Sequence, residues 1–308
     1  MKPAPVALFA FRRPDHLAKV VAGLLANSEA AQTQLWVFCD GAKGAADVDG
    51  VAAVRRFARA IKGFAGLTVV ERSENFGLAR SIREGVSQLC ASDGRVVVLE
   101  DDVVPTPFFL AYVNAGLERY ADDARVISIG CYTYDGGRDL PPTFFLNIPD
   151  CWGWAVWARS WAQFEPDGTK LLAALTARGR LRSFDFDGAY PYTKMLKDQI
   201  AGGNASWAIL WYAHAALTGQ LTIYPHRSVT SNIGQDGSGT HGGKLEAGPL
   251  ILRLADSPVD VLPILVEECA SARRAWTECL SAAQGTRLRR ASYSVRHRLS
   301  RMTRARLR

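Results

Sequence analysis

Short apolar segments alternate with longer amphipathic segments over the first 130 residues. Each apolar run is followed by a stretch whose apolar side chains recur at helical spacing. The expected strands are Val6–Phe11, Leu35–Cys39, Leu67–Val70, Arg95–Leu99 and Val126–Gly130. The expected helices between them are 15–27, 48–61, 78–90 and 107–120. Because the strands are apolar throughout, we expect an α/β fold, a mostly parallel sheet covered by helices on both faces.

The regular alternation ends near residue 131. The stretch 131–150 is rich in Gly, Pro, Tyr and Phe, which predicts loops around a short strand at Phe144–Asn147. The later expected elements are helices at 155–164, 169–178, 188–201, 206–218 and 259–279, and a strand at 220–224. We therefore divide the chain into a first half, 1–130, an α+β second half of the same domain, 131–258, and a C-terminal helix and tail, 259–308.

Composition narrows the class of protein. The chain has 308 residues, of which 48% are hydrophobic and 22% charged, as in globular proteins. It contains no apolar run of about 18 residues, so we expect no transmembrane helix. The N-terminus lacks the pattern of a signal peptide, and the six cysteines form no CxxC pair. These features predict reduced thiols and a cytoplasmic protein.

The basic charge is concentrated in the C-terminal tail. The chain has 37 basic and 30 acidic residues, and nine of the arginines lie in 287–308. Without those nine, 28 basic residues face 30 acidic ones, so the body of the protein is nearly neutral. We expect no nucleic-acid partner for such a body. The tail mixes arginines with apolar residues, which suits either an anionic membrane surface or a solvated, disordered segment.

Three consecutive acids follow the fourth expected strand. The segment RVVVLEDDVVP brings Glu100, Asp101 and Asp102 to the carboxyl end of a buried strand, where α/β sheets bind their ligands. A helix cap would need only one acid. Adjacent like charges are tolerated where a cation neutralises them, and carboxylate oxygens suit Mn²⁺ or Mg²⁺. The sequence therefore predicts a metal–diphosphate site here.

The order of several motifs resembles the nucleotide-sugar glycosyltransferases of the GT-A fold, which is Rossmann-like. The variant is similar to N-acetylglucosaminyltransferase I and to bacterial family-2-type transferases, over roughly residues 5–245. The motifs are VALFAFRRP, VFCDG, VVVLEDDVVPTPFFLAY, IPDCWGWAVWARSWAQFEP and SNIGQDGSGTHGG. The resemblance implies that 1–130 binds the nucleotide-sugar and that 131–258 binds the acceptor and supplies a lid.

The resemblance assigns donor-site roles to residues at the strand ends. It implies that Asp102 is a metal ligand and that Glu100 and Asp101 lie near the ribose and base. It places Asp40 against a uracil ring, although a turn before Gly41 is an equal explanation. Arg80 would point at the nucleotide or else be a solvated surface residue.

Other candidates follow from the residue types themselves. Arg12 or Arg13 could contact the base or diphosphate, although Pro14 makes a helix start equally natural there. Asp150, Trp152 and Gly153 suit a sugar platform, because aromatic faces pack on sugar C–H surfaces. Core packing is the alternative for that aromatic segment. His241, in a Gly-rich stretch, is a candidate ligand of the metal or the diphosphate and is otherwise a solvated histidine.

The general base does not transfer from the family. The matching segment, SWAILW, has Ala208 where the family has an acid. The candidates are Asp236, which is preferred because it lies in the expected lid, then Asp198 and Asp187.

We therefore expect a metal-dependent, inverting glycosyltransferase with a UDP-sugar donor and a glycan or lipid-linked glycan acceptor. Two alternatives remain. A nucleotidyltransferase predicts a Gly-rich loop after the first strand, which FAFRRPDHL lacks. A non-catalytic nucleotide-sugar or glycan-binding module would tolerate the missing base.

Overall fold

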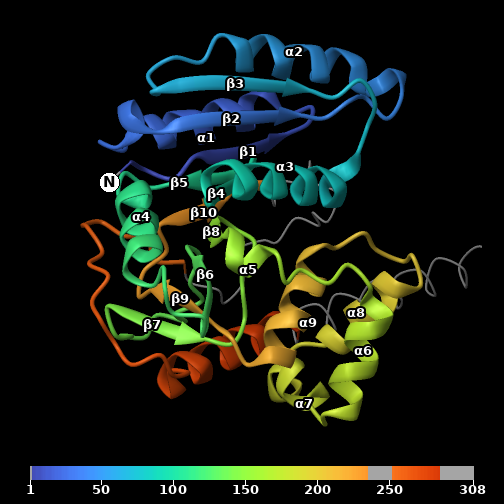
Figure 1. The fold of residues 1–308 in the computed structure, drawn as a ribbon, viewed down its shortest axis with the longest axis vertical. Coiled ribbons are helices and arrows are strands. Elements are labelled where there is room, and N and C mark those ends of the chain that lie inside the picture. The colour runs from blue at the N-terminus through green and yellow to red at the C-terminus, as the bar shows by residue number, and fades with distance from the viewer. Residues whose placement is uncertain (1, 235–251, 285–308) are drawn as a thin grey trace, which may run out of the picture.

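The computed structural model describes residues 2–234 and 252–284. Within those residues, eight strands form one sheet in the order β3-β2-β1-β4-β8-β6-β9-β7 (Figure 1). The sheet strands are β1 Val6–Ala10, β2 Gln34–Cys39, β3 Gly66–Glu71, β4 Arg95–Glu100, β6 Val126–Gly130, β7 Thr143–Leu146, β8 Trp154–Trp157 and β9 Leu221–Pro225. The first four are mutually parallel, while β8 runs antiparallel to both β4 and β6. The α/β class and the mostly parallel sheet of a GT-A fold are thereby confirmed.

Helices cover both faces of this sheet (Figure 1). They are α1 Pro14–Leu25, α2 Val48–Arg59, α3 Gly77–Asp93, α4 Phe109–Arg119, α5 Ala158–Trp161, α6 Gly168–Ala177, α7 Leu181–Phe184, α8 Tyr192–Ile200 and α9 Ala208–Thr218. One buried core joins the strands to α1, α2 and α4. A second joins the opposite face to α3, α5 and α9. A third core lies around β7, β9 and α6–α9.

The first half follows the expected pattern closely. All five expected strands and all four expected helices form, with ends within a few residues of the expected ones. Helix α1 illustrates the cause, because Pro14 occupies its first turn and Leu17, Val20, Val21 and Leu24 point into the core. Successive residues of β1 alternate between the two cores, and all are buried, as the unbroken apolar run predicts.

The segment 155–164 was expected to be one helix, and this prediction is wrong. Trp154–Trp157 is instead a strand, β8, inserted antiparallel between β4 and β6, and only the short α5 follows it. Trp154 and Val156 contribute to the core beneath α3, while Ala155 and Trp157 contribute to the core beneath α4. A four-residue strand that is buried on both faces has no alternating pattern by which a short helix could be excluded.

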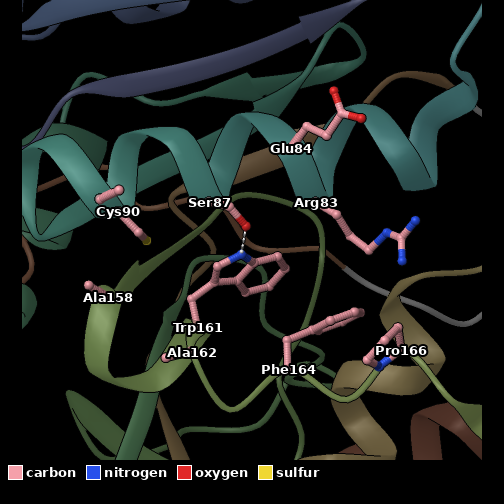
Figure 2. Close-up of a pocket in the computed structure, with 10 residues that line it drawn as sticks. Arg83, Glu84, Ser87, Cys90, Ala158, Trp161, Ala162, Phe164 and Pro166 are labelled. Atoms are coloured by element: carbon pink, nitrogen blue, oxygen red, sulfur yellow. Dashed lines mark hydrogen bonds between the residues drawn. The ribbon is translucent and has the colours of Figure 1, made fainter.

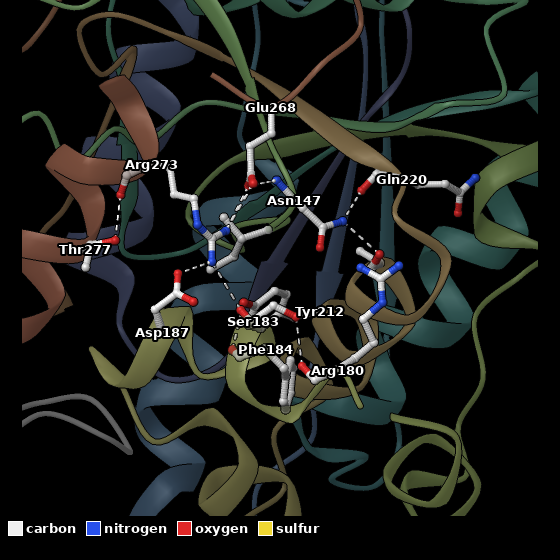
Figure 3. A network of polar contacts seen from close by, with 12 residues as sticks. Asn147, Arg180, Ser183, Phe184, Asp187, Tyr212, Gln220, Glu268, Arg273 and Thr277 are labelled. Carbon is white, nitrogen blue, oxygen red and sulfur yellow. Dashed lines mark hydrogen bonds and ion pairs between the residues drawn. The ribbon is translucent and has the colours of Figure 1, made fainter. Parts of the chain in front are cut away.

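The C-terminal helix also begins later than expected. Residues 259–269 are not helical, and a helix covers 270–284. Pro258 and Pro263 lie at the start of the expected helix, where proline removes a backbone donor and obstructs the preceding turn. Figure 3 shows how the helix is attached, with Arg273 between Glu268 and Asp187.

Two short strands complete the fold beside the acids. β5 Val103–Pro105 pairs antiparallel with β10 Thr230–Asn232, so residues far apart in the chain meet directly after the acid triplet. Neither strand was expected from the pattern, because three residues are too few to carry a period. Among the described residues, no helix is long and apolar enough to cross a membrane.

Candidate functional site

The acid triplet lies where β4 ends and β5 begins. Glu100 is the last residue of β4, and Asp101 and Asp102 form the turn that leads into β5. The backbone carbonyl of Asp102 accepts a hydrogen bond of 2.8 Å from the amide of Ile233, just beyond β10. The turn is therefore fixed on both sides, by the main sheet and by the β5–β10 ribbon.

Arg13 lies against two of the three acids. Its Nη2 donates to Asp102 Oδ2 at 2.8 Å and also contacts Asp101 Oδ1. The second oxygen of Asp101 accepts from the amide of Phe11 at 3.3 Å. Pro14 begins α1 directly after Arg13, so the helix start is realised, and contact of Arg13 with the base or diphosphate stays a prediction.

Burial disfavours the charged forms of the ionisable side chains in this cluster. It raises the pKa of Asp101, although Arg13 and the amide of Phe11 act in the opposite direction. It also raises the pKa of Glu100 well above its usual value, with further contributions from Asp102 and Asp101. For Arg13, burial alone would lower the pKa, but the two carboxylates more than offset it and the net shift is upward. The cluster thus carries more negative charge than Arg13 balances.

Two buried atoms at the centre of the cluster have no hydrogen-bond partner among the described residues. They are Asp102 Oδ1, an acceptor, and Arg13 Nη1, a donor. An unpaired buried polar atom costs about 1–3 kcal/mol, so such atoms in native proteins require an explanation. Gly234 approaches closely, because a side chain there would collide with Asp102 Oδ2. A carboxylate oxygen and a guanidinium N–H that both lack a partner fit a cation paired with an anion, as in the complex of a metal ion with a diphosphate.

No preformed cage of three or more His, Cys, Asp or Glu side chains exists in residues 2–234 and 252–284. Mg²⁺ commonly binds through one or two carboxylates together with substrate phosphates. Asp102 fits this mode, because its Oδ1 has no hydrogen-bond partner among the described residues and a carboxylate oxygen is a hard ligand. His241 lies outside the described residues, so its role as a second ligand stays a prediction.

Asp40, at the end of β2, is fully satisfied by neighbouring groups. Its Oδ1 accepts from the amides of Gly41 and Phe76, and its Oδ2 accepts from Asn75 Nδ2 and the amide of Gly77. These amides include the first ones of α3, so Asp40 caps that helix from another strand. Its predicted contact with a uracil ring stays a prediction beside this structural role.

The remaining predicted donor-site arginines lie on the surface. Arg12 pairs with Asp47 and has an exposed side chain. Arg80, one turn into α3, pairs with Glu84 at 2.7 Å and stacks on Phe76 at 3.5 Å from the ring centre. Both side chains are reachable from solvent near the ends of β1 and β3, and their contact with a nucleotide stays a prediction.

Asp150, Trp152 and Gly153 form the turn that leads into β8. The carbonyl of Trp152 accepts from Thr230 Oγ1 at 2.7 Å, which ties this turn to β10. Gly153 has a φ of +85°, and a side chain there would collide with Thr230. Trp152 lies edge-on against Tyr132, with 4.7 Å between the ring centroids, and it is partly exposed. Trp154 and Trp157, by contrast, are core residues. Core packing therefore holds for Trp154 and Trp157, and the sugar platform at Asp150, Trp152 and Gly153 stays a prediction.

Of the predicted bases, the two that the structure describes, Asp198 and Asp187, pair with other residues and not with the acid triplet. Asp198 pairs with Lys194 on the exposed side of α8. Asp187 pairs with Arg273 at 2.9 Å in the network of Figure 3, where it holds the C-terminal helix against the α7 region. Asp236 lies outside the described residues. Ala208 begins α9, so the structure offers no acid at that position.

A cavity lies away from these residues. It has a volume of about 580 Å³ between α3 and the α5–α6 connection, and Trp161, Phe164 and Arg83 are among its lining residues (Figure 2). Trp161 Nε1 donates to Ser87 on α3 at 3.0 Å across it. No residue predicted for the site lines this cavity.

Sequence reasoning missed two contributors to the site, Thr230 and Tyr132. Both reach the acid edge only through pairing between distant segments, β10 with β5 and the 131–134 segment with the β8 turn. No local pattern could have indicated either residue.

Comparison with known proteins finds one family whose model matches nearly half of the chain. Residues 3–152 match the family described as glycosyltransferase like family 2, and the match includes Arg13, the acid triplet and Asp150. No curated protein sequence matches the chain.

The solved structures that are similar to the chain include the following two. The mannosyltransferase PcManGT from Pyrobaculum calidifontis, in complex with GDP-Man and Mn²⁺, is 16% identical, with 71% of this chain and 75% of that one covered and a TM-score of 0.40. TarS from S. aureus is 12% identical, with 44% and 23% covered and a TM-score of 0.30. The chain therefore spans less than a quarter of TarS. The expected family-2-type resemblance is confirmed by the family match, and the likeness to N-acetylglucosaminyltransferase I stays a prediction.

Proposed function

Because residues 3–152 carry a glycosyltransferase 2-like domain, we propose that the protein is a metal-dependent, inverting transferase. It moves a sugar from a nucleoside diphosphate-sugar, UDP-linked, to a hydroxyl of a glycan acceptor. The observation that carries this proposal is the pair of unpaired buried atoms, Asp102 Oδ1 and Arg13 Nη1, at the end of β4. One is suited to a divalent cation and the other to a phosphate oxygen.

Each donor-site residue has a distinct task in this proposal. Asp102 holds Mn²⁺ or Mg²⁺, which when bound offsets the charge that develops on the leaving diphosphate. Arg13 donates its free N–H to the diphosphate while it keeps the turn of Asp101 and Asp102 in place. Glu100, whose raised pKa favours its neutral form, can donate a hydrogen bond to the ribose or base. Arg12 and Arg80 lie at the rim and attract the anionic donor.

The acceptor enters from the side of the β8 turn. Trp152 is partly exposed beside Tyr132 and Tyr134, which offers an aromatic surface to the C–H face of a sugar. Residues 131–258 form the acceptor half, and Asp236 and Asp198 are the bases that the sequence suggests. We further propose a cytoplasmic enzyme of cell-surface polysaccharide or glycoconjugate synthesis that transfers a hexose or N-acetylhexosamine. Residues 287–308 would touch an anionic membrane, where a lipid-linked acceptor is found.

The test is release of nucleoside diphosphate from a panel of UDP-, GDP- and dTDP-sugars, with Mn²⁺, with Mg²⁺ and with EDTA. Short oligosaccharides and water serve as acceptors. The proposal expects turnover of one nucleotide class, dependent on metal and abolished by EDTA. Binding of a nucleotide-sugar with no turnover under any condition would favour a non-catalytic binding module instead.

A further inference from the structure

One carboxylate on the acceptor side, that of Asp150, has so far been considered only as part of the sugar platform. It lies in the turn between β7 and β8, four residues before Trp154, which pairs with Val98 of β4. The turn therefore passes the end of β4, where Glu100 and the other two acids lie. Leu99 of β4 also lies 3.4 Å from where a side chain on Gly153 would begin, so this turn contacts the strand directly.

The turn that carries Asp150 is anchored by three different elements. The amide of Cys131, after β6, donates to the carbonyl of Gly153 at 3.1 Å. Thr230 of β10 donates to the carbonyl of Trp152, and the hydroxyl of Tyr224 in β9 donates to the carbonyl of Ile148. A group held from three elements keeps a fixed position, which a proton acceptor requires.

The surroundings of Asp150 hold no compensating cation. None of the described lysines or arginines pairs with it, and its contacts with donors are backbone amides, including that of Trp152 at 3.3 Å. The titratable groups near it are Glu100 on the donor side and, on the acceptor side, Tyr132, Tyr134, Tyr224, Cys131 and Cys151. Asp150 as a whole residue is partly exposed, so the turn that carries it borders the solvent.

We propose that Asp150 is the general base of the transfer, an inference that rests on the proposed function. The acceptor hydroxyl oxygen attacks the anomeric carbon of the donor sugar and forms the new glycosidic bond. The bond between that carbon and the diphosphate oxygen breaks, and its electron pair leaves with the nucleoside diphosphate. The hydroxyl proton passes to the carboxylate of Asp150. The residue thus supplies the group that is absent at Ala208.

The electrostatics of the position suit this role. Burial raises the pKa of Asp150 to about 7, against the opposing effect of the amides of Cys151 and Trp152. A base is most effective when its pKa lies near the working pH, because it is then both largely deprotonated and a competent proton acceptor. A carboxylate with an ordinary pKa would be a weaker base.

The experiment compares Asp150→Asn with wild type and with Asp256→Asn, a matched change at an exposed aspartate that pairs with Arg227. The donor is the nucleotide-sugar turned over fastest in the panel, and water is the acceptor probe. We expect kcat to fall at least about 100-fold in Asp150→Asn, with the affinity for nucleoside diphosphate and Mn²⁺ unchanged within about threefold. Asp256→Asn should match wild type.

Two further readouts separate a base from a structural residue. The kcat of wild type should rise with pH through about 7, the pKa of Asp150, because only the deprotonated form accepts a proton. The residual activity of Asp150→Asn should lack that rise. At pH 8 the variant should unfold at the same or a higher temperature than wild type, because a raised carboxyl pKa makes the charged form unfavourable in the folded state.

Retention of kcat within about fivefold, or loss of folding or of donor affinity in Asp150→Asn, would overturn the assignment. As a second variant, Asp150→Ala should regain activity with formate or azide, which replace the missing carboxylate. If wild type itself turns over no donor, the proposed function fails and the assignment fails with it. If wild type is active and metal-dependent while Asp150→Asn remains active, only this inference fails.

Discussion

Strands β2 and β4 lie on either side of β1, and an aspartate follows each of them, but the two carboxylates differ in their partners. Asp40, after β2, accepts four hydrogen bonds and has no oxygen to spare. Asp102, after β4, shares one oxygen with Arg13 and leaves the other buried and unpaired. The same residue type at equivalent strand ends therefore has two different tasks.

The difference separates a carboxylate that stabilises the fold from one whose second oxygen pairs with no described group. Four donors around Asp40 fix the path from β3 into α3, and Gly41 approaches the backbone of Glu74 so closely that no side chain would fit. The unpaired oxygen of Asp102 stabilises nothing among the described residues, and leaving it buried carries a cost. Proteins retain such costs mainly at functional sites.

Asp102→Asn should have the largest effect on activity. It removes the charge that holds the metal, so we expect kcat/KM for the donor to fall by about 1,000-fold or more, equivalent to about 4 kcal/mol. Thermal unfolding in the absence of ligand should be unchanged or shifted upward, since negative charge is removed from a cluster of three acids. If Asp102→Asn kept normal turnover and unfolded at a lower temperature than wild type, Asp102 would stabilise the fold and would not hold the metal.

Asp40→Ala should have the largest effect on stability. It leaves the amides of Phe76 and Gly77 and the side chain of Asn75 without their acceptor, so we expect the free energy of unfolding to fall by about 3 kcal/mol. Urea denaturation measures this change. Asp40→Asn, which keeps one acceptor oxygen, should lose less. If Asp40→Ala kept its stability and lost only nucleotide affinity, the uracil contact would be its main role.

Arg13→Gln should change metal and nucleotide affinity in opposite directions. Loss of the guanidinium leaves Asp101 and Asp102 without their cation, so Mn²⁺ alone should bind about threefold more tightly. The nucleoside diphosphate loses a charged donor and should bind about tenfold more weakly, equivalent to about 1.4 kcal/mol. Separate titrations of Mn²⁺ and of UDP with Mn²⁺ measure the two effects. A loss of both affinities would show that Arg13 only maintains the turn.

Arg80→Ala should have the smallest effect. Its side chain is exposed and already pairs with Glu84, so we expect nucleotide affinity to fall by about twofold at low salt and not at all at 0.5 M salt, because exposed charges are screened. A salt-independent loss of tenfold or more would instead show direct contact between Arg80 and the nucleotide.

The first half of the fold could be predicted from the sequence because each of its strands and helices has a recognisable pattern of apolar residues within its own segment. The strands are continuous apolar runs and the helices have an apolar face, so neighbours in the chain become neighbours in the sheet. In the second half, β8 enters the sheet between β4 and β6 from a distant part of the chain. Only the contacts made after folding reveal that WAVW is a strand.

The candidate site shows the same division. Asp102 and Arg13 were predicted because both follow apolar strands, and parallel strands bring their carboxyl ends to one edge. Which oxygen is satisfied could not be predicted, since that depends on Ile233, Gly234 and the β5–β10 ribbon. The bases predicted from the sequence, Asp236 and Asp198, lie in a Gly-rich and in a helical segment. Asp150, predicted for the sugar platform, lies in a turn anchored by three separate elements, and its role as the base is a proposal.

Titration calorimetry of UDP into wild type, with and without Mn²⁺, tests the central claim that the unpaired oxygen of Asp102 belongs to a metal–diphosphate site. We expect Mn²⁺ to strengthen UDP binding by at least about tenfold and Asp102→Asn to abolish this gain. Equal binding with and without Mn²⁺, or an equal gain in Asp102→Asn, would contradict it, because the open oxygen would then have no part in holding the donor.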